Sequence, residues 1–212
     1  ATYQLDGNSN DVSGNYSGTD TDIKYAYDGT ESNIEYRFGR FGQAAVFNGS
    51  SSTIATPAKI PSSLNFSFSF WFNTTSTYAS GYIFSTKENS LTNGYYLLAN
   101  NGLIQYGEGN GSTNATAQYS TTTDLNDGNW HHCVLTRAAG GTVNMYIDNI
   151  KEVNNASVGS GYMTSSNWRN NLRIGRYSGV HPSGLYYNGK LDQVRIYDAV
   201  LTSDQVTELY NE

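Results

Sequence analysis

A strict alternation of phenylalanine with other residues marks one short segment of this chain. In NFSFSFWFN (65–73), phenylalanines at every second position share one face, while Ser67, Ser69 and Trp71 share the other. A period of two is typical of a β-strand and is incompatible with an amphipathic helix. The segment therefore predicts a strand with its phenylalanine face in a core. Further runs that indicate strands are AAVF (44–47), GYIFST (81–86), YYLLA (95–99), GLIQYG (102–107), WHHCVLTR (130–137), TVNMYID (142–148), NLRIGRY (171–177) and KLDQVRIYD (190–198).

Turn dipeptides separate these runs. Asp-Gly occurs at 6–7, 28–29 and 127–128, and Asn-Gly at 48–49, 93–94, 101–102, 110–111 and 188–189. Both dipeptides accept the positive φ angles that tight hairpin turns require. The segment 142–153 is typical of a hairpin with its turn near Asp148 to Ile150. Many short strands spaced by about 8–12 residues predict an antiparallel sandwich or barrel.

One helix is expected, close to the C-terminal end. Thr202 and Gln205 match a capping box ahead of the apolar positions Val206, Leu209 and Tyr210. The helix would be about two turns long, which is too short to be stable alone in water. We therefore expect the last strand to complete a sheet and the helix to cover an edge or an end of it.

An ordered series of motifs runs along nearly the whole chain. It comprises YQLDGNSNDVSGNYSG (3–18), FGRFGQAAVFNGSSSTI (38–54), DGNWHHCVLTR (127–137), VNMYIDN (143–149), LRIGRYSG (172–179) and YNGKLDQVRIYDAVLTSDQVTELY (187–210). In this order the series resembles the laminin-G-like jelly rolls of the concanavalin A-like lectin/glucanase superfamily. The resemblance implies two antiparallel sheets of about six or seven strands each, with the N- and C-terminal strands side by side.

We predict an all-β fold, a single domain over residues 1–212. It is an antiparallel two-sheet β-sandwich, a concanavalin A-like jelly roll, with one short C-terminal helix. Cys133, the only cysteine, lies in a strand-like run where the family pattern usually has Val, so we expect a small buried side chain. The expected core comprises Phe47, Phe66, Phe68, Phe70, Phe72, Leu97, Leu135, Met145, Ile147, Ile174, Val194 and Ile196.

Charge and composition narrow the functional classes. The net charge of −6 argues against nucleic acid as the main partner, because phosphate binding needs a basic face. No apolar run approaches the ~20 residues of a membrane helix, so no membrane insertion is expected. The start, ATYQLDGNSN, lacks the basic and apolar regions of a signal peptide. Charged residues make up only 14% of the chain, a composition common among extracellular and virion proteins.

No catalytic constellation stands out in the sequence. Glycosidases need two carboxylates about 5–10 Å apart, and the glucanase branch of the superfamily has a pattern like E-x-D-x-E. No two glutamates share an expected strand with that spacing. There is no nucleophile elbow for a Ser-His-Asp site. His131 and His132 are adjacent in a strand, point to opposite faces and cannot share a metal. We therefore do not expect an enzyme.

An acidic segment near the N-terminus suggests a cation site. Residues 6–35 carry many acids against one base, Lys24, and Ca²⁺ prefers carboxylate, carbonyl and amide oxygens. Relatives in the superfamily often hold a structural calcium ion near the paired termini. The resemblance thus implies a calcium ion held by Asp11 and Asn15, with Asp192. The alternative is that the Asp, Ser, Gly and Asn residues here form only Asx-type turns.

Two polar, aromatic loops are candidate ligand sites, one at 160–170 and one at 177–189. Aromatic rings stack on the C–H faces of sugars, and Tyr and Trp add a polar atom at low entropic cost. The alternative is that these rings pack over sheet edges. Basic residues also gather between 169 and 195, which fits either an anionic glycan or a solvated strand face. The candidate ligand-binding residues are Tyr162, Trp168, Tyr177, His181, Tyr186 and Tyr187.

The resemblance implies recognition of carbohydrates or proteins, since such domains are appended to glycosidases, adhesins, surface proteins and phage structural proteins. We predict a non-catalytic recognition module, extracellular or on a virion surface, that binds carbohydrate on a cell surface or a polysaccharide. The alternative is a structural or adhesive module of a virion or surface appendage that acts through protein–protein contacts. Fold analogy by itself does not decide between them.

Overall fold

Two antiparallel β-sheets make up the protein in the computed structural model of the chain. The structure describes residues 2–10, 12, 28–56, 64–77, 81–86, 94–109, 118–158, 172–178 and 185–212. Every pairing between neighbouring strands is antiparallel within these ranges.

In the described part of the chain, the first sheet has eight strands. They are β1 (Thr2–Tyr3), β3 (Glu35–Phe38), β4 (Gln43–Asn48), β6 (Phe66–Asn73), β11 (His131–Arg137), β12 (Thr142–Ile147), β13 (Ile150–Ser157) and β15 (Asn188–Tyr197). Their order is β13-β12-β11-β6-β15-β4-β3, and β1 pairs with β15 beside this path.

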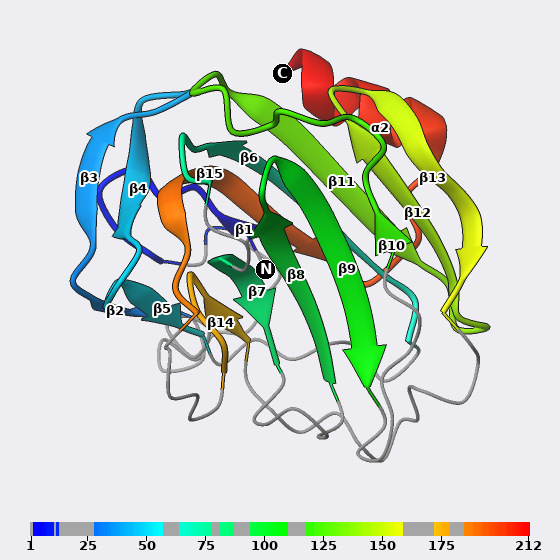
Figure 1. The fold of residues 1–212 in the computed structure, drawn as a ribbon, viewed down its shortest axis with the longest axis horizontal. Coiled ribbons are helices and arrows are strands. Elements are labelled where there is room, and N and C mark those ends of the chain that lie inside the picture. Colours follow the sequence, from blue (N-terminus) through cyan, green and yellow to red (C-terminus); the bar gives the residue numbers. More distant parts are fainter. Residues whose placement is uncertain are drawn as a thin grey trace, which may run out of the picture.

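The second sheet has seven strands among the residues that the structure describes. They are β2 (Thr30–Ser32), β5 (Thr53–Ala55), β7 (Gly81–Ser85), β8 (Gly94–Asn100), β9 (Leu103–Gly109), β10 (Gln118–Tyr119) and β14 (Arg173–Ile174). Their order is β10-β9-β8-β7-β14-β5-β2. In Figure 1, β7, β8 and β9 stand in front of β6 and β11, so the two sheets form the predicted sandwich.

The two ends of the chain meet in the first sheet. Thr2 pairs with Arg195 and Tyr3 with Val194. This pairing confirms the side-by-side terminal strands that the family resemblance implied. The predicted hairpin at 142–153 is also confirmed, because Asp148 and Asn149 take positive φ angles of 49° and 67° between β12 and β13.

The predicted phenylalanine face of β6 forms the centre of the core. All four of its rings are 0% exposed, and Phe70 meets Phe84 of the second sheet edge to face, with ring centroids 4.9 Å apart. The predicted core residues are buried except Ile196, which is partly buried and packs against the same cluster. Cys133 is buried as expected, and burial raises the pKa of its thiol.

The C-terminal helix, α2 (Ser203–Asn211), lies on the outer face of the first sheet. This corrects the expectation that it would cover an edge or an end. Val206 and Leu209 of the helix pack with Val134 and Tyr146 of the sheet in a second, smaller cluster. The predicted capping box is present between Thr202 and Gln205. No helix in the described part of the chain is long and apolar enough to cross a membrane.

One buried ion pair joins the two sheets. Arg137 of β11 and Glu108 of β9 have side chains that are 0% exposed, and Arg137 Nε lies 2.7 Å from Glu108 Oε1. Arg137 Nη2 donates to Glu108 Oε2 at 3.2 Å, while Nη1 donates to the carbonyls of Leu64 and Ala138 at 3.1 and 2.9 Å. The Tyr106 hydroxyl donates to Glu108 Oε1 at 2.6 Å. Each nitrogen and oxygen of the pair thus has a partner, which a buried charge requires.

Removing one partner of this ion pair should strongly destabilise the fold. We expect Glu108→Gln to lower the free energy of unfolding by about 3–5 kcal/mol, because it leaves the Arg137 charge buried and unpaired. Urea unfolding followed by tryptophan fluorescence measures the change. Arg37→Gln, which breaks the exposed pair with Glu35, should cost less than about 1 kcal/mol. An equally small loss in Glu108→Gln would contradict this account.

Candidate functional site

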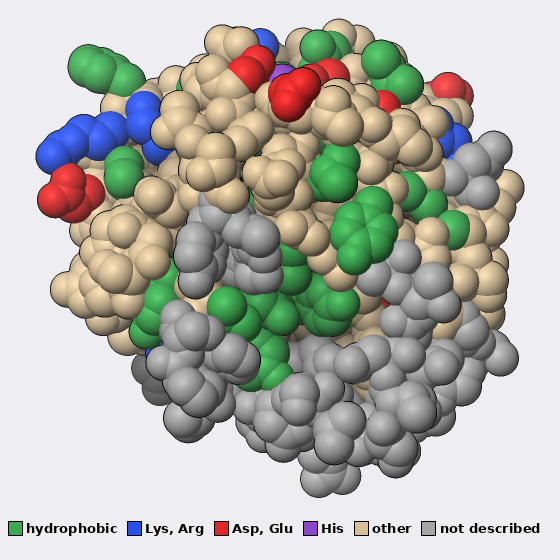
Figure 2. Space-filling model, viewed as in Figure 1, with side chains coloured by type: hydrophobic (Ala, Val, Ile, Leu, Met, Phe, Trp, Pro, Cys, Tyr) green, Lys and Arg blue, Asp and Glu red, His purple; other side chains and the backbone are tan. Residues whose placement is uncertain are grey.

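The outer face of the second sheet carries a set of tyrosines. Phe84, Leu97 and Tyr106 are adjacent in register on β7, β8 and β9, and all three are buried in the core. Side chains alternate along a strand, so the neighbours of Leu97 and Tyr106 point outward. On β7 a register shift between Tyr82 and Phe84 turns Tyr82 to the same outer side. Figure 2 shows hydrophobic side chains gathered near the centre of this view, over β7, β8 and β9.

Three of these outward residues form what we name the tyrosine face: Tyr82, Tyr96 and Tyr119. The rings of Tyr82 and Tyr96 lie 5.6 Å apart between centroids. Tyr119, in β10, pairs in register with Gln105 and is 44% exposed. Tyr177 supports this face from the side, since its ring meets Tyr82 edge to face at 5.2 Å.

The Tyr96 ring lies across the backbone of Gly107 instead of standing upright on the sheet. Tyr96 and Gly107 are cross-strand partners in β8 and β9. A Cβ atom on Gly107 would sit only 2.4 Å from Cζ and Oη of Tyr96. The glycine therefore makes room for the ring, and a strand glycine often marks such a close approach. One side of the partly exposed Tyr96 ring therefore rests on the sheet.

Two amide side chains fix the position of the Tyr96 hydroxyl. Gln105 Nε2 donates to Tyr96 Oη at 3.2 Å, and Asn100 Nδ2 donates to Gln105 Oε1 at 3.1 Å. Burial raises the pKa of Tyr96, and the nearby Tyr119 adds to the rise. The Tyr96 phenol is therefore neutral and held in a fixed position, with its hydroxyl group at the edge of the ring. This arrangement can stack on one apolar face and hydrogen-bond at its edge.

The structure describes half of the six predicted ligand residues. Tyr177 is 3% exposed and Tyr187 is 1% exposed, and Tyr187 packs edge to face on Phe47 of the core at 5.9 Å. Tyr186 is partly buried, and the guanidinium of Arg176 lies 5.3 Å from its ring. In this structure, Tyr177 and Tyr187 therefore support the sheet. Tyr162, Trp168 and His181 lie outside the described residues.

The sequence interpretation named the strands of the tyrosine face without assigning them a role. GYIFST and YYLLA were both expected strands, and the alternation of YYLLA separates Tyr96 from the core residue Leu97. Tyr82 and Phe84 are two residues apart, so alternation alone would place them on one face, and the register shift between them turns Tyr82 outward. A reading of the outward positions would have found Tyr96, whereas Tyr82 depends on the β-bulge between β7 and β8. The contact between Tyr96 and Gly107 needs the register of β8 with β9, which no single strand contains.

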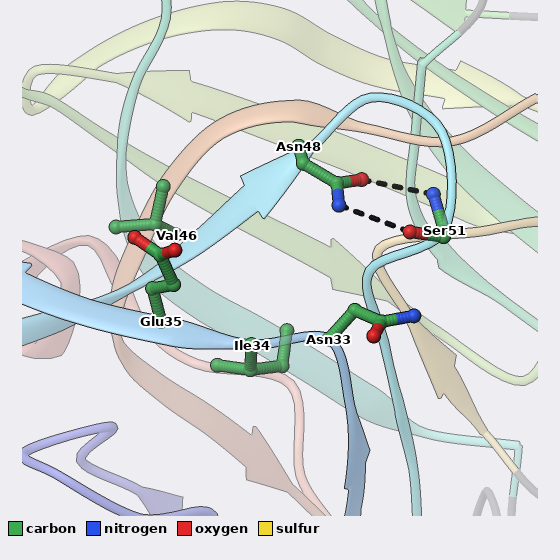
Figure 3. A pocket seen from close by; sticks show the side chains of 6 residues that line it. All are labelled: Asn33, Ile34, Glu35, Val46, Asn48 and Ser51. Atoms are coloured by element: carbon green, nitrogen blue, oxygen red, sulfur yellow. Dashed lines mark hydrogen bonds between the residues drawn. The ribbon is translucent and has the colours of Figure 1, made fainter.

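A shallow pocket of about 380 Å³ lies at the edge where β2, β3 and β4 meet. It is lined by Asn33, Ile34, Glu35, Val46, Asn48 and Ser51 (Figure 3). Both ends of the Asn48 amide bond to Ser51, at 2.8 and 3.0 Å, and Glu35 is paired with Arg37 at 2.7 Å. These polar groups already have partners within the protein, so the pocket is a weaker candidate than the tyrosine face.

Asp192, a predicted metal ligand, holds the turn between β3 and β4. Its Oδ2 accepts from Phe41 N at 2.9 Å, and its Oδ1 is buried without a hydrogen-bond partner. Burial raises the pKa of Asp192 to about 6, and the nearby Asp6 adds to the rise. Asp11 and Asn15 lie outside the described ranges. Within those ranges, no group of three or more His, Cys, Asp or Glu side chains could hold a metal ion.

A serine–histidine pair lies beneath α2, where a substrate has no access. Ser69 Oγ and His132 Nε2 are 2.9 Å apart, and His132 is 1% exposed. Its ring stacks on Trp71 at 4.9 Å, and Tyr210 of the helix lies 6.0 Å away. Burial lowers the pKa of His132 to about 4. His131 lies on the other face of β11, as predicted, with Nδ1 2.7 Å from an oxygen of Asp148.

Known structures share this fold. Domain 4 of AbnA, a GH43 extracellular arabinanase from Geobacillus stearothermophilus solved with arabinotriose, matches with a TM-score of 0.67 and 22% identity over 99% of this chain and 97% of that domain. The binding domain of Paraclostridial Mosquitocidal Protein 1 matches with a TM-score of 0.68 and 14% identity over 87% of this chain. Botulinum neurotoxin type C, whose cell entry depends on interaction with two ganglioside molecules, matches with a TM-score of 0.65 and 11% identity over 88% of this chain.

The coverage differs between these structures. The chain spans nearly all of the arabinanase domain but only 47% of each of the two toxin structures. At these identities the likeness shows a common fold. A comparison with curated proteins finds no match. The sequence profile of the Concanavalin A-like lectin/glucanases superfamily matches residues 48–207, and the chain belongs to this superfamily.

Proposed function

We propose that this chain is a non-catalytic carbohydrate-binding module with its binding site on the tyrosine face. The observation that carries the proposal is the Tyr96 ring, which lies across Gly107 and is held there through Gln105. A ring fixed in this way can stack on the C–H face of a sugar with little further loss of conformational entropy. The hydroxyl groups of Tyr82 and Tyr119 and the amides beside them add hydrogen bonds at the edge.

The structural comparisons support a sugar ligand. The arabinanase domain was solved with arabinotriose and shares this fold over nearly its whole length. The botulinum neurotoxin type C structure concerns ganglioside recognition. We extend from these proteins to this chain the binding of glycans and an extracellular location. A glycan array identifies the specific glycan.

Loss of the Tyr96 ring should weaken glycan binding while the fold is kept. We expect Tyr96→Ala to bind the best ligand of a glycan array about tenfold more weakly, or roughly 1.4 kcal/mol in binding free energy. Isothermal titration calorimetry measures the affinities. The matched control is Tyr210→Ala, because Tyr210 is also partly buried but lies on α2 at the opposite sheet. Equal affinities for wild type and Tyr96→Ala would refute this site.

A second variant tests the position of the ring without removing it. Gly107→Ala places a Cβ atom where Cζ and Oη of Tyr96 now lie, so the ring must lift off the sheet. We expect this variant to lose glycan affinity as Tyr96→Ala does, although every aromatic group remains. Circular dichroism confirms that the sandwich is intact in both variants.

We also propose that a structural calcium ion binds near the paired termini. The unpartnered, buried Oδ1 of Asp192 and the adjacent Asp6 fit a cation, since two carboxylates without a counter-charge repel each other. The described residues supply too few ligands alone, so Asp11 and Asn15 would complete the site. Bound calcium would neutralise these carboxylates and stiffen the turn at Phe41.

The pH dependence of stability tests this calcium site. Because the folded pKa of Asp192, about 6, exceeds its unfolded value, the calcium-free wild type should lose about 2 kcal/mol of stability relative to Asp192→Asn as pH rises from 4 to 6. Calcium binds the ionised carboxylate, so adding it at pH 7.5 should raise the Tm. Scanning calorimetry with calcium and with EDTA measures both effects. Asp192→Asn should abolish the response to calcium, and an unchanged response would exclude Asp192 as a ligand.

One observation favours the second function, a structural or adhesive module. Phe38 is 91% exposed at the end of β3, an edge strand of the first sheet. A large apolar side chain in that position suits a contact with another protein. Virion or appendage proteins are the partners that we predict for this function.

Self-association separates the second function from the first. If Phe38 serves an assembly of this chain, the wild type should sediment as an oligomer and Phe38→Ser as a monomer, because the serine removes the apolar contact. Analytical ultracentrifugation over a range of protein concentrations measures this. The control is Ile150→Ser, at the start of β13, where the isoleucine is 65% exposed. A wild-type monomer at every concentration would count against self-assembly through this edge.

A further inference from the structure

Arg173 is a charged side chain on the same face as Tyr96. In register, Arg173 of β14 pairs with Ser85 of β7, and Ser85 pairs with Tyr96 of β8. The neighbouring Ile174 is buried in the core, so Arg173 points to the outer side. Two strand spacings separate Arg173 from Tyr96, or about 10 Å between backbones. Ser85 lies between them in register and is buried.

The guanidinium of Arg173 has no hydrogen bond, ion pair or ring contact among the residues that the structure describes. Other cations of these ranges are engaged, as Arg137 is with Glu108 and Arg195 with Glu212. Lys151 lies over the ring of Tyr146, and Arg176 lies over that of Tyr186. Arg173 is partly buried all the same. Withdrawing a charge from water without a partner is unfavourable, so such a residue is suited to an external anion.

The described strands of the second sheet offer no acid that could compete for this position. In its described strands the acidic residues are Glu31 and Glu108. Glu108 is buried and paired with Arg137. Glu31 lies opposite the core residue Ile54 in register, and its carboxylate accepts from the Tyr36 hydroxyl at 2.6 Å. Among the described strands the outer face therefore carries a positive charge at Arg173, although the chain as a whole has a net charge of −6.

We infer that the tyrosine face selects a sugar with an anionic group, its ring stacked on Tyr96 and its anion held by Arg173. This inference rests on the proposed function and adds the chemical class of the ligand. A guanidinium offers two parallel N–H donors that match the oxygens of a carboxylate or a sulfate. Uronic acids and sulfated sugars share this chemistry, and the experiment below separates them.

The test compares charged and neutral polysaccharides on the same protein. Affinity electrophoresis uses polygalacturonate and alginate as carboxylated ligands, dextran sulfate as the sulfated ligand, and dextran and arabinan as neutral ones. Arg173→Gln should lower the affinity for the acidic ligand about tenfold, the size of a charge-assisted hydrogen bond. Arg37→Gln removes the same charge from an exposed site on the other sheet and should change nothing. Binding of the acidic ligand should also weaken as the salt concentration rises, because salt screens the attraction between charges.

The outcomes separate the inference from the proposed function. An acidic ligand that needs both Tyr96 and Arg173 supports both of them, and its identity tells carboxylate from sulfate. A neutral ligand that needs Tyr96 but ignores Arg173→Gln overturns the inference and leaves the proposed function intact. If binding of the acidic ligand is lost equally in Arg37→Gln, or survives in Tyr96→Ala, the ligand is attracted by charges outside the tyrosine face, and the inference is overturned. Binding to no polysaccharide overturns both.

Discussion

The buried pair of Arg137 and Glu108 fixes the relation between the two sheets on which the tyrosine face depends. Glu108 can reach Arg137 only if it points into the core, and Tyr106, two residues earlier, points the same way and donates to it. Alternation then forces Gly107 outward. A slip of β9 by one residue would bury Gly107 and expose a charged carboxylate. The ion pair therefore sets the register that places Gly107 under the Tyr96 ring.

The strands were largely predictable from the sequence, because their inward faces carry large apolar residues at every second position. The place of the helix was not. Ser67 and Ser69 look like solvent positions in the alternation of β6, yet both are buried. Ser67 donates to the carbonyl of Ala199 at 2.7 Å and accepts from Leu201 N at 3.1 Å, which brings the chain ahead of α2 onto the sheet. A serine hydroxyl that forms hydrogen bonds with the backbone of another segment does not change the alternation of polar and apolar residues in its own strand.

The candidate site was harder to predict, for a related reason. The sequence interpretation looked to aromatic loops, where function is common, and two of those residues support the sheet instead. Tyr177 packs against Tyr82, and Tyr187 is part of the core. What makes Tyr96 different is a cross-strand neighbour with no side chain. That neighbour, Gly107, is eleven positions away in the sequence, and only the register of two strands brings the pair together.

The distribution of charge gives a reason for the low charge content of the chain. Fixed charges are used inside, where Arg137 and Glu108 link the sheets, while Asn, Ser, Thr and Tyr wet much of the surface. Hydroxyl and amide groups donate and accept equally well, so they can bond to a ligand made mainly of hydroxyl groups without a large desolvation penalty. On such a surface, one unpaired arginine meets little competition from neighbouring acids. Stacking on Tyr96 can then supply affinity for many sugars, while Arg173 discriminates among them by charge.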